Sequence, residues 1–152
     1  LVGAQLAFAI QNNDMFAYER DLESMSRRYK DYVMLYLLSV IVRRFEQGET
    51  PQTAQEMAIQ DRLPIRLVQQ LLSRLEETNI IRRVYVEQEE DETFVPALDT
   101  RKITVDMVVG RISAQGTEEF LQHTPPQMHA FWKRYLQMCE ANTSDNILVS
   151  DL

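Results

Sequence analysis

The sequence predicts a mainly α-helical fold with one small β-hairpin, and three observations support this. Apolar residues recur every three or four positions through most of the chain, which is the period of an amphipathic helix. The segment 80–95 is instead rich in β-branched and aromatic residues on either side of a charged run. The expected order is long helix, short helix, tight turn, second helix and hairpin. This is a winged helix-turn-helix with flanking N- and C-terminal helices.

The composition is that of one globular domain with extensions. The chain has 152 residues, of which 45% are hydrophobic and 26% are charged. A formal net charge of −7 argues against a general nucleic-acid-binding surface, although a local basic patch is compatible with it. Cys139 is the single cysteine, so no intramolecular disulfide can form, which fits a reducing compartment.

The strongest helical pattern runs from Tyr29 to Phe45, after an amphipathic stretch over 14–28. Its expected core face is Tyr29, Tyr32, Val33, Tyr36, Leu37, Val40, Ile41 and Phe45. Further apolar side chains lie on its other faces: Met34, Leu35, Leu38 and Val42. A helix that is apolar over so much of its circumference is expected to be covered on more than one side. It is either a central core helix or an interface to a partner.

Local signals place the helix-turn-helix between residues 48 and 79. Gly48 can end the long helix, and Thr53 with Glu56 forms a capping-box pattern that opens a short helix. Pro64 is well placed to begin the next helix, where its missing N–H costs nothing. That helix closes near Asn79, a residue that tolerates the left-handed conformation.

The usual task of this fold is to read DNA with the second helix of the pair. The candidate DNA-contacting residues are Arg62, Arg66, Gln69, Gln70, Arg74, Arg82 and Arg83. The hairpin argues against this function, because its tip is acidic where a wing normally meets phosphates. These acids are Glu87, Glu89, Glu90, Asp91 and Glu92. We therefore favour a protein-contact function for the module, with DNA binding as the alternative.

Two helices are predicted after the hairpin. Thr104 can cap the first, over about 105–114, and Pro126 begins the second. The second carries a regular apolar stripe of Met128, Phe131, Trp132, Tyr135, Leu136 and Cys139. The predicted partner interface combines this stripe with the long helix, at Met34, Leu35, Leu38, Val42, Phe131, Trp132 and Tyr135. The alternative is that these two helices cover each other.

Two stretches of the chain carry a family resemblance. The chain opens with LVGAQLAFAIQN, and its predicted second helix reads LPIRLVQQLLSRL, with VPALD and ITV further on. They resemble the last transmembrane helix and a soluble winged-helix extension in the YihY/virulence factor BrkB family of bacterial inner-membrane proteins. The resemblance implies a fragment cut within the last membrane helix, with the rest on the cytoplasmic side. Arg27, Arg28 and Lys30 fit this placement, since basic residues favour the cytoplasmic end of a membrane helix.

Members of that family are also labelled ribonuclease BN, but the residues do not support catalysis. Metal-dependent nucleases need histidines and carboxylates that converge on an ion. The sequence has only His123 and His129, six residues apart, and contains no phosphate-binding loop or nucleophile motif. We predict no enzyme activity and no catalytic, cofactor or metal site.

The predicted organisation has four parts. Residues 1–28 are a remnant of the last membrane helix and a connector helix, and 29–116 are the winged-helix domain. Residues 117–141 are C-terminal packing helices, and 142–152 are a tail, either frayed or docked. The predicted function is protein contact or regulation of the membrane part of a polytopic inner-membrane protein. The predicted partner is the chain itself, as a homodimer, or its membrane portion, with nucleic acid disfavoured. The alternative is a DNA-binding transcription regulator of the winged-helix type.

Overall fold

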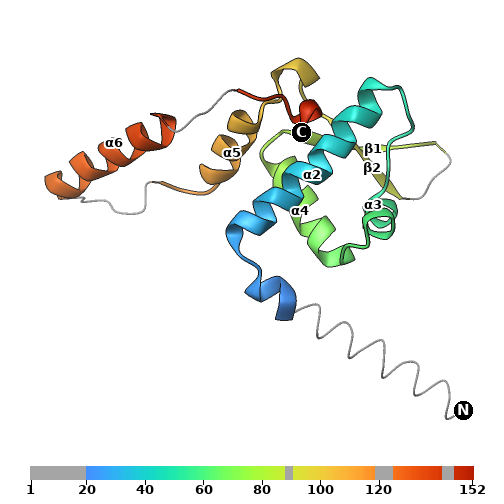
Figure 1. Cartoon of the computed structure of the whole chain (residues 1–152), viewed down its shortest axis with the longest axis horizontal. Helices are drawn as coiled ribbons and strands as arrows, with labels where there is room; N and C mark the ends of the chain where they lie inside the picture. Colours follow the sequence, from blue (N-terminus) through green and yellow to red (C-terminus); the bar gives the residue numbers. More distant parts are fainter. Residues whose placement is uncertain (1–19, 88–90, 119–124, 142–145) are drawn as a thin grey trace, which may run out of the picture.

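A computed structural model describes residues 20–87, 91–118, 125–141 and 146–152, and it confirms the mainly helical fold with a two-stranded hairpin (Figure 1). The elements in chain order are α2 (Arg27–Glu46), α3 (Ala54–Asp61), α4 (Ile65–Glu77), β1 (Ile81–Tyr85), β2 (Glu92–Pro96), η1 (Thr100–Lys102), α5 (Val105–Ser113), α6 (Pro126–Ala141) and η2 (Val149–Asp151). Helix α2 crosses the centre of the molecule, with α4 and the hairpin packed against it.

Helix α2 begins two residues earlier than the sequence pattern predicts. The Ser26 hydroxyl accepts a hydrogen bond from the Tyr29 N–H at 3.2 Å, which caps the first turn. A helical stretch over 20–24 precedes this cap and is separated from α2 by residues 25 and 26. The amphipathic segment therefore does not run continuously into the long helix. Gly48 adopts a φ of 69° just after the C-terminal end of α2, which ends at Glu46.

The exposed side of α2 carries aromatic residues that we expected in the core. These side chains are 40–61% exposed: Tyr29, Tyr32, Tyr36 and Phe45. A tyrosine at the rim keeps its hydroxyl satisfied, and the Tyr36 hydroxyl donates to Asp61 Oδ1 at 2.9 Å. The core face is therefore rotated away from the tyrosines.

Three α2 side chains that we predicted at a partner interface are instead completely buried: Met34, Leu38 and Val42. They belong to the hydrophobic core of the chain itself, where α2 meets α4, β2 and η2. Leu35, the fourth, is half-buried against the same core. Burial of a purely aliphatic side chain contributes more free energy than burial of a tyrosine. The face of α2 that carries the aliphatic residues is therefore the one that packs in the core. Met34, Leu38 and Val42 are therefore not available to a partner, and that part of the prediction is corrected.

The helix-turn-helix forms as its local signals predict. Thr53 and Glu56 make the reciprocal capping-box hydrogen bonds that open α3. Arg62 ends α3 in the left-handed region with a φ of 52°, and the chain turns directly into α4 after Pro64. Helix α4 then buries one face, consisting of Leu67, Val68, Leu71, Leu72 and Leu75. Its other face stays in solvent.

The hairpin is antiparallel, with Ile81 opposite Pro96 and Tyr85 opposite Glu92. Its tip at 88–90 lies outside the described residues. An isolated bridge between Thr53 and Thr93 ties the start of α3 to β2. The wing is thus anchored beside the helix-turn-helix.

The end of the chain docks on the core. Val149 is fully buried, and its N–H donates to the Ile103 carbonyl at 3.0 Å. Arg43 of α2 donates through Nε to the Ser150 carbonyl at 3.2 Å and also to the Leu152 carbonyl. Of the two outcomes left open for the tail, residues 146–152 take the docked one.

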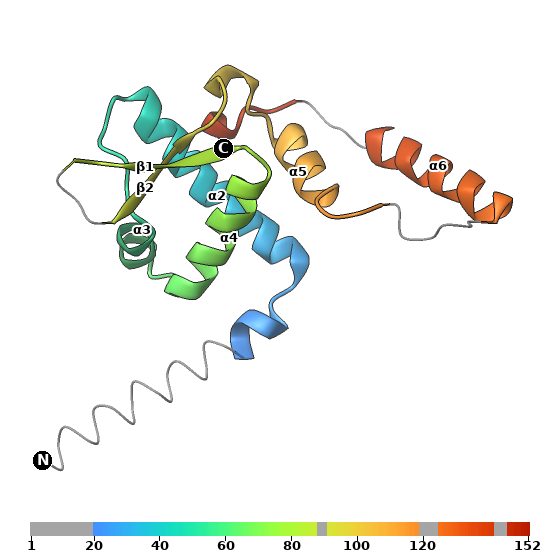
Figure 2. The same cartoon turned by 180° about the vertical axis from the view of Figure 1, so that it is seen from behind.

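Helix α6 lies apart from the rest of the domain in both views (Figures 1 and 2). Every one of its residues is exposed, including Phe131 at 72% and Tyr135 at 50%. The alternative in which α6 and α2 cover each other is therefore wrong.

Candidate nucleic-acid interface

The solvent face of α4 presents polar and basic side chains. Arg66, Gln69 and Gln70 are exposed, and Ser73 and Arg74 are half-buried further along the helix. They point away from the core because the apolar positions of α4 all lie on its opposite face. The structure thus brings four of the predicted DNA-contacting residues, Arg66, Gln69, Gln70 and Arg74, onto one helix surface.

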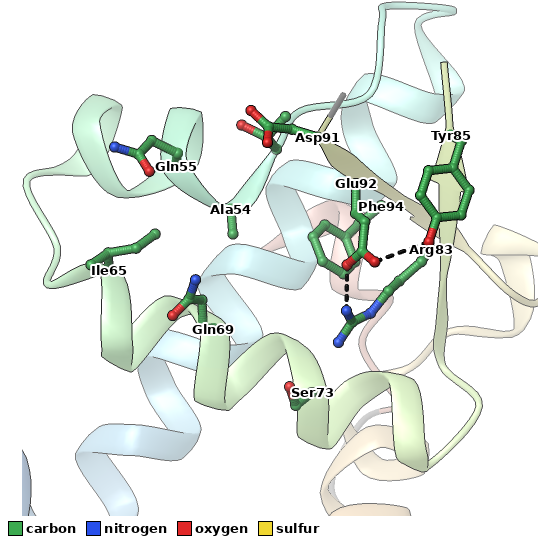
Figure 3. A pocket seen from close by; sticks show the side chains of 11 residues that line it. Ala54, Gln55, Ile65, Gln69, Ser73, Arg83, Tyr85, Asp91, Glu92 and Phe94 are labelled. Atoms are coloured by element: carbon green, nitrogen blue, oxygen red, sulfur yellow. Dashed lines mark hydrogen bonds and ion pairs between the residues drawn. The ribbon is translucent and has the colours of Figure 1, made fainter. Parts of the chain in front are cut away.

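A groove of about 560 Å³ separates this surface from the wing. Figure 3 shows Gln69 and Ser73 of α4 on one wall and Arg83, Tyr85 and Glu92 of the hairpin on the other. Residues Ala54 and Gln55 of α3 close one end. The groove is open and polar, so it can admit part of a large ligand.

Arg83 stands in this groove between two carboxylates. Its Nε lies 2.5 Å from Glu76 Oε2 on α4, and its Nη1 contacts Glu92 Oε2 on β2. The Tyr85 hydroxyl donates to the other oxygen of Glu92 at 3.0 Å. The guanidinium also lies over the Phe94 ring, 5.8 Å from its centroid. We call Glu76, Arg83 and Glu92 the acidic clamp.

Hydrogen bonds in and beside the clamp shift the pKa values of Arg83, Tyr85 and Glu92. The hydrogen bond from Arg83, followed by that from Tyr85, holds the pKa of Glu92 below its usual value. The hydrogen bond to Glu76 raises the pKa of Arg83, and the hydrogen bond to Glu92 raises that of Tyr85. Both shifts of the Arg83–Glu92 pair favour its charged form.

Replacing Arg83 by alanine is expected to raise the pKa of Glu92, because both the donor and its positive charge are lost. The folded pKa of Glu92 lies below that of the unfolded chain. Its ion pair therefore stabilises the fold at neutral pH, and this contribution disappears as the pH falls through the folded pKa. A ¹³C NMR titration of the Glu92 carboxyl measures the shift. Arg82→Ala is the control, and an unchanged pKa in Arg83→Ala would contradict the clamp.

The other two predicted arginines lie away from the groove. Arg62 is exposed in the turn between α3 and α4. Arg82 is exposed on β1, and strand alternation places it on the opposite face of the hairpin from Arg83. Among the predicted wing acids, Glu92 belongs to the clamp, whereas Glu87 and Asp91 are exposed. Glu89 and Glu90 lie outside the described residues.

Sequence reasoning missed two groups of residues. It did not pair Glu76 with Arg83, although the two side chains are in contact. It also treated Arg27 and Lys30 as residues at the end of a membrane helix, whereas they line hollows beside α4. Neither arrangement has a sequence signal, since it depends on how separate elements pack.

Within the described residues, no group of three or more histidine, cysteine or acidic side chains is placed to hold a metal ion. His129 is exposed on α6, as is Cys139, and His123 lies outside the described residues. In the part of the chain that the structure covers, no helix is both long enough and apolar enough to span a bilayer.

Known proteins are similar to this chain in structure but not in sequence. Neither a protein-family model nor a curated protein sequence matches the chain. Among solved structures, IscR of T. potens has 17% sequence identity and a TM-score of 0.54, over 86% of this chain and 87% of its own. CymR of Staphylococcus aureus has 17% identity and a TM-score of 0.50, over 80% and 93%. A Listeria innocua protein assigned as a transcriptional regulator is equally similar, at 17% and 0.50, over 80% and 78%.

These neighbours overturn the membrane-protein interpretation. They are transcriptional regulators, with IscR and CymR belonging to the Rrf2 family, and they match most of the chain. The assignment to the YihY/virulence factor BrkB family is wrong, and so is the inner-membrane location that rested on it. The matching letters of α4 include Leu67, Val68 and Leu71, which are buried core positions of this helix. The opening LVGAQLAFAIQN lies outside the described residues.

The neighbours also correct the predicted function and partner. The main interpretation was protein contact with nucleic acid disfavoured, and the regulator fold favours the alternative instead. The error came from treating the acidic hairpin as decisive, whereas the exposed face of α4 carries Arg66 and Arg74 apart from the tip of the wing. The prediction that the chain is not an enzyme agrees with these neighbours. The chain has a winged helix-turn-helix fold shared with transcriptional regulators.

Proposed function

We propose that this chain is a DNA-binding transcription regulator of the winged-helix type that acts as a homodimer. The observation that carries the proposal is the exposed face of α4, where Gln69 and Gln70 lie between Arg66 and Arg74 on a helix-turn-helix. The second helix of this motif is the one that enters the major groove. Glutamine can bond both the N6 and N7 positions of adenine there, and arginine can bond guanine or phosphate.

The length of α4 also suits this task. Arg66 and Arg74 are eight residues apart, which corresponds to about 12 Å along a helix axis at a rise of about 1.5 Å per residue. A major groove is about 12 Å wide. The exposed face of α4 therefore matches the groove in size, with the glutamines lying between the two arginines along the helix.

Helix α6 supports the homodimer. Its exposed apolar side chains are Met128, Phe131, Trp132, Tyr135, Leu136 and Met138. A stripe of this size is costly to leave in water and is typical of an association surface. Two copies joined in this way would present two α4 helices to two half-sites, which is how dimeric helix-turn-helix proteins gain affinity.

Selection from a random duplex pool tests sequence-specific binding. We expect the chain to enrich a two-part site, and Gln69→Ala to weaken binding to that site by about 5- to 150-fold, the value of one bidentate base contact. Gln137→Ala, an exposed glutamine of α6, is the matched control and should bind as the wild type does. Failure to enrich any sequence, or equal loss in both variants, would contradict α4 as the reading helix.

A further inference from the structure

The two sides of α4 differ in charge. On the wing side, Arg83 is held between Glu76 and Glu92, and Asp91 also lines the groove. A phosphate approaching Arg83 would meet two carboxylates at contact distance from the guanidinium. The wing side is therefore poorly suited to hold a polyanion, because a phosphate contact needs a cation that can replace counterions.

The other side of α4 faces the start of α2 and is basic. One hollow of about 400 Å³ is lined by Lys30, Arg66 and Gln70, together with Leu22 and Glu23. A second, of about 450 Å³, is lined by Arg27, Lys30 and Arg74 together with part of α5. Lys30 lines both, so the hollows form one surface along α4. The four basic side chains on it, which we call the α2-side cations, are Arg27, Lys30, Arg66 and Arg74.

Among the described residues of the two hollows, few acids lie beside Arg27, Lys30 and Arg74. Glu23 is the single acidic lining residue. The nearest carboxylate to Arg27 is that of Asp31, and its separation of 4.0 Å from Nε is at the limit of an ion pair. The Arg27 side chain is 68% exposed, so it can turn toward a ligand. Among the described residues that line the two hollows, four cations therefore accompany one carboxylate, although the whole chain carries a charge of −7.

We propose that the phosphate backbone of DNA is held on the α2 side of α4, by the α2-side cations, and not by Arg83 of the wing. The proposal rests on the DNA-binding function above and assigns the location of its electrostatic contacts. Duplex DNA is the occupant because the cations run along the exposed helix that fits the major groove. Its phosphates would lie next to α4 on the side where Lys30 projects between Arg66 and Arg74.

The test is fluorescence anisotropy with a mixed-sequence duplex of about two helical turns, using the full chain between about 50 and 200 mM salt. We compare wild type with Arg27→Gln/Lys30→Gln and with Arg83→Gln. The charge-matched control is Arg101→Gln/Lys102→Gln, on η1. In both views this segment, between the hairpin and α5, lies at the top of the molecule, whereas α2 begins lower down (Figures 1 and 2). Circular dichroism verifies that each variant is folded.

Removing two phosphate contacts is expected to reduce the slope of log affinity against log salt by about 1.8. We expect Arg27→Gln/Lys30→Gln to show this reduction and at least a tenfold weaker affinity at low salt. Arg83→Gln and the η1 control should keep the wild-type slope. The charge-preserving Arg27→Lys/Lys30→Arg variant should bind as the wild type does, which separates charge from local structure.

The outcomes separate this inference from the proposed function. A wild-type chain that binds no duplex at low salt would overturn DNA binding itself, and this inference with it. Wild-type binding that Arg27→Gln/Lys30→Gln leaves unchanged would overturn only the location of the phosphate contacts. A reduced slope in Arg83→Gln would mean that Arg83 of the wing contacts the DNA phosphates.

Discussion

Replacing Leu38 by alanine is expected to lower the free energy of unfolding by about 2–5 kcal/mol, the range for a buried leucine whose removal leaves a cavity. Leu38 is fully buried at the centre of α2, where the core of the whole domain meets. Urea denaturation at one fixed protein concentration measures the loss as a lower midpoint with an unchanged slope. Because the side chain is internal, association of the folded protein should not change.

Ile59→Ala is the matched control for this experiment. Ile59 is also a branched aliphatic residue on a helix, but it is 70% exposed on α3. Its replacement should change the stability by no more than about 0.5 kcal/mol. The opposite pattern for Leu38→Ala, with unchanged stability and weaker association, would mean that α2 serves a partner surface instead of the core.

Most of the fold could be predicted because its signals are local. The capping box at Thr53, Pro64 before α4 and the left-handed Asn79 each act within a few residues, and the structure places each at an element boundary. Helix α4 has only one apolar face, so its hydrophobic periodicity is sufficient to place its buried side.

Periodicity failed on α2 because the helix is apolar nearly all round. Tyr32 and Leu38 both fit a helical stripe, and only the packing of α4, β2 and η2 decides which is buried. The docked tail contributes to this choice, since Val149 fills the core from a point more than 100 residues away in sequence. Long-range packing of this kind leaves no local signal.

The residues on the exposed face of α4 were predicted correctly, but the charge of the surface that they form was not. Arg66, Gln69 and Arg74 were identified from the helix-turn-helix pattern, and they do share the exposed face of α4. The decision against DNA came from the acids of the hairpin and from the net charge of the whole chain. In three dimensions Glu76 and Glu92 form ion pairs with Arg83. Lys30 of α2 lies beside Arg66 and Gln70 of α4. Surface charge is a property of the fold, so a linear sum could not reveal it.

Changing Phe131 and Tyr135 together to serine is expected to abolish the homodimer while leaving the winged-helix domain folded. Both side chains are at least half exposed on α6, which buries none of its residues against the rest of the chain. Large aromatic residues at the centre of an interface typically contribute about 2 kcal/mol or more each. Loss of even one such contact raises the dissociation constant of the dimer about 30-fold or more. Sedimentation velocity over a concentration series measures the shift from dimer to monomer.

The control variant is Lys133→Ser/Gln137→Ser, which makes the same two changes to serine on the opposite face of α6. It should remain dimeric, so that a loss confined to Phe131→Ser/Tyr135→Ser reports the apolar stripe and not a weakened helix. Because a dimer places two α4 helices on one duplex, the monomeric variant should also bind a two-part site more weakly while retaining binding to a single half-site. A wild-type chain that is monomeric at every concentration would contradict the homodimer, and equal dissociation of both variants would contradict the stripe as its interface.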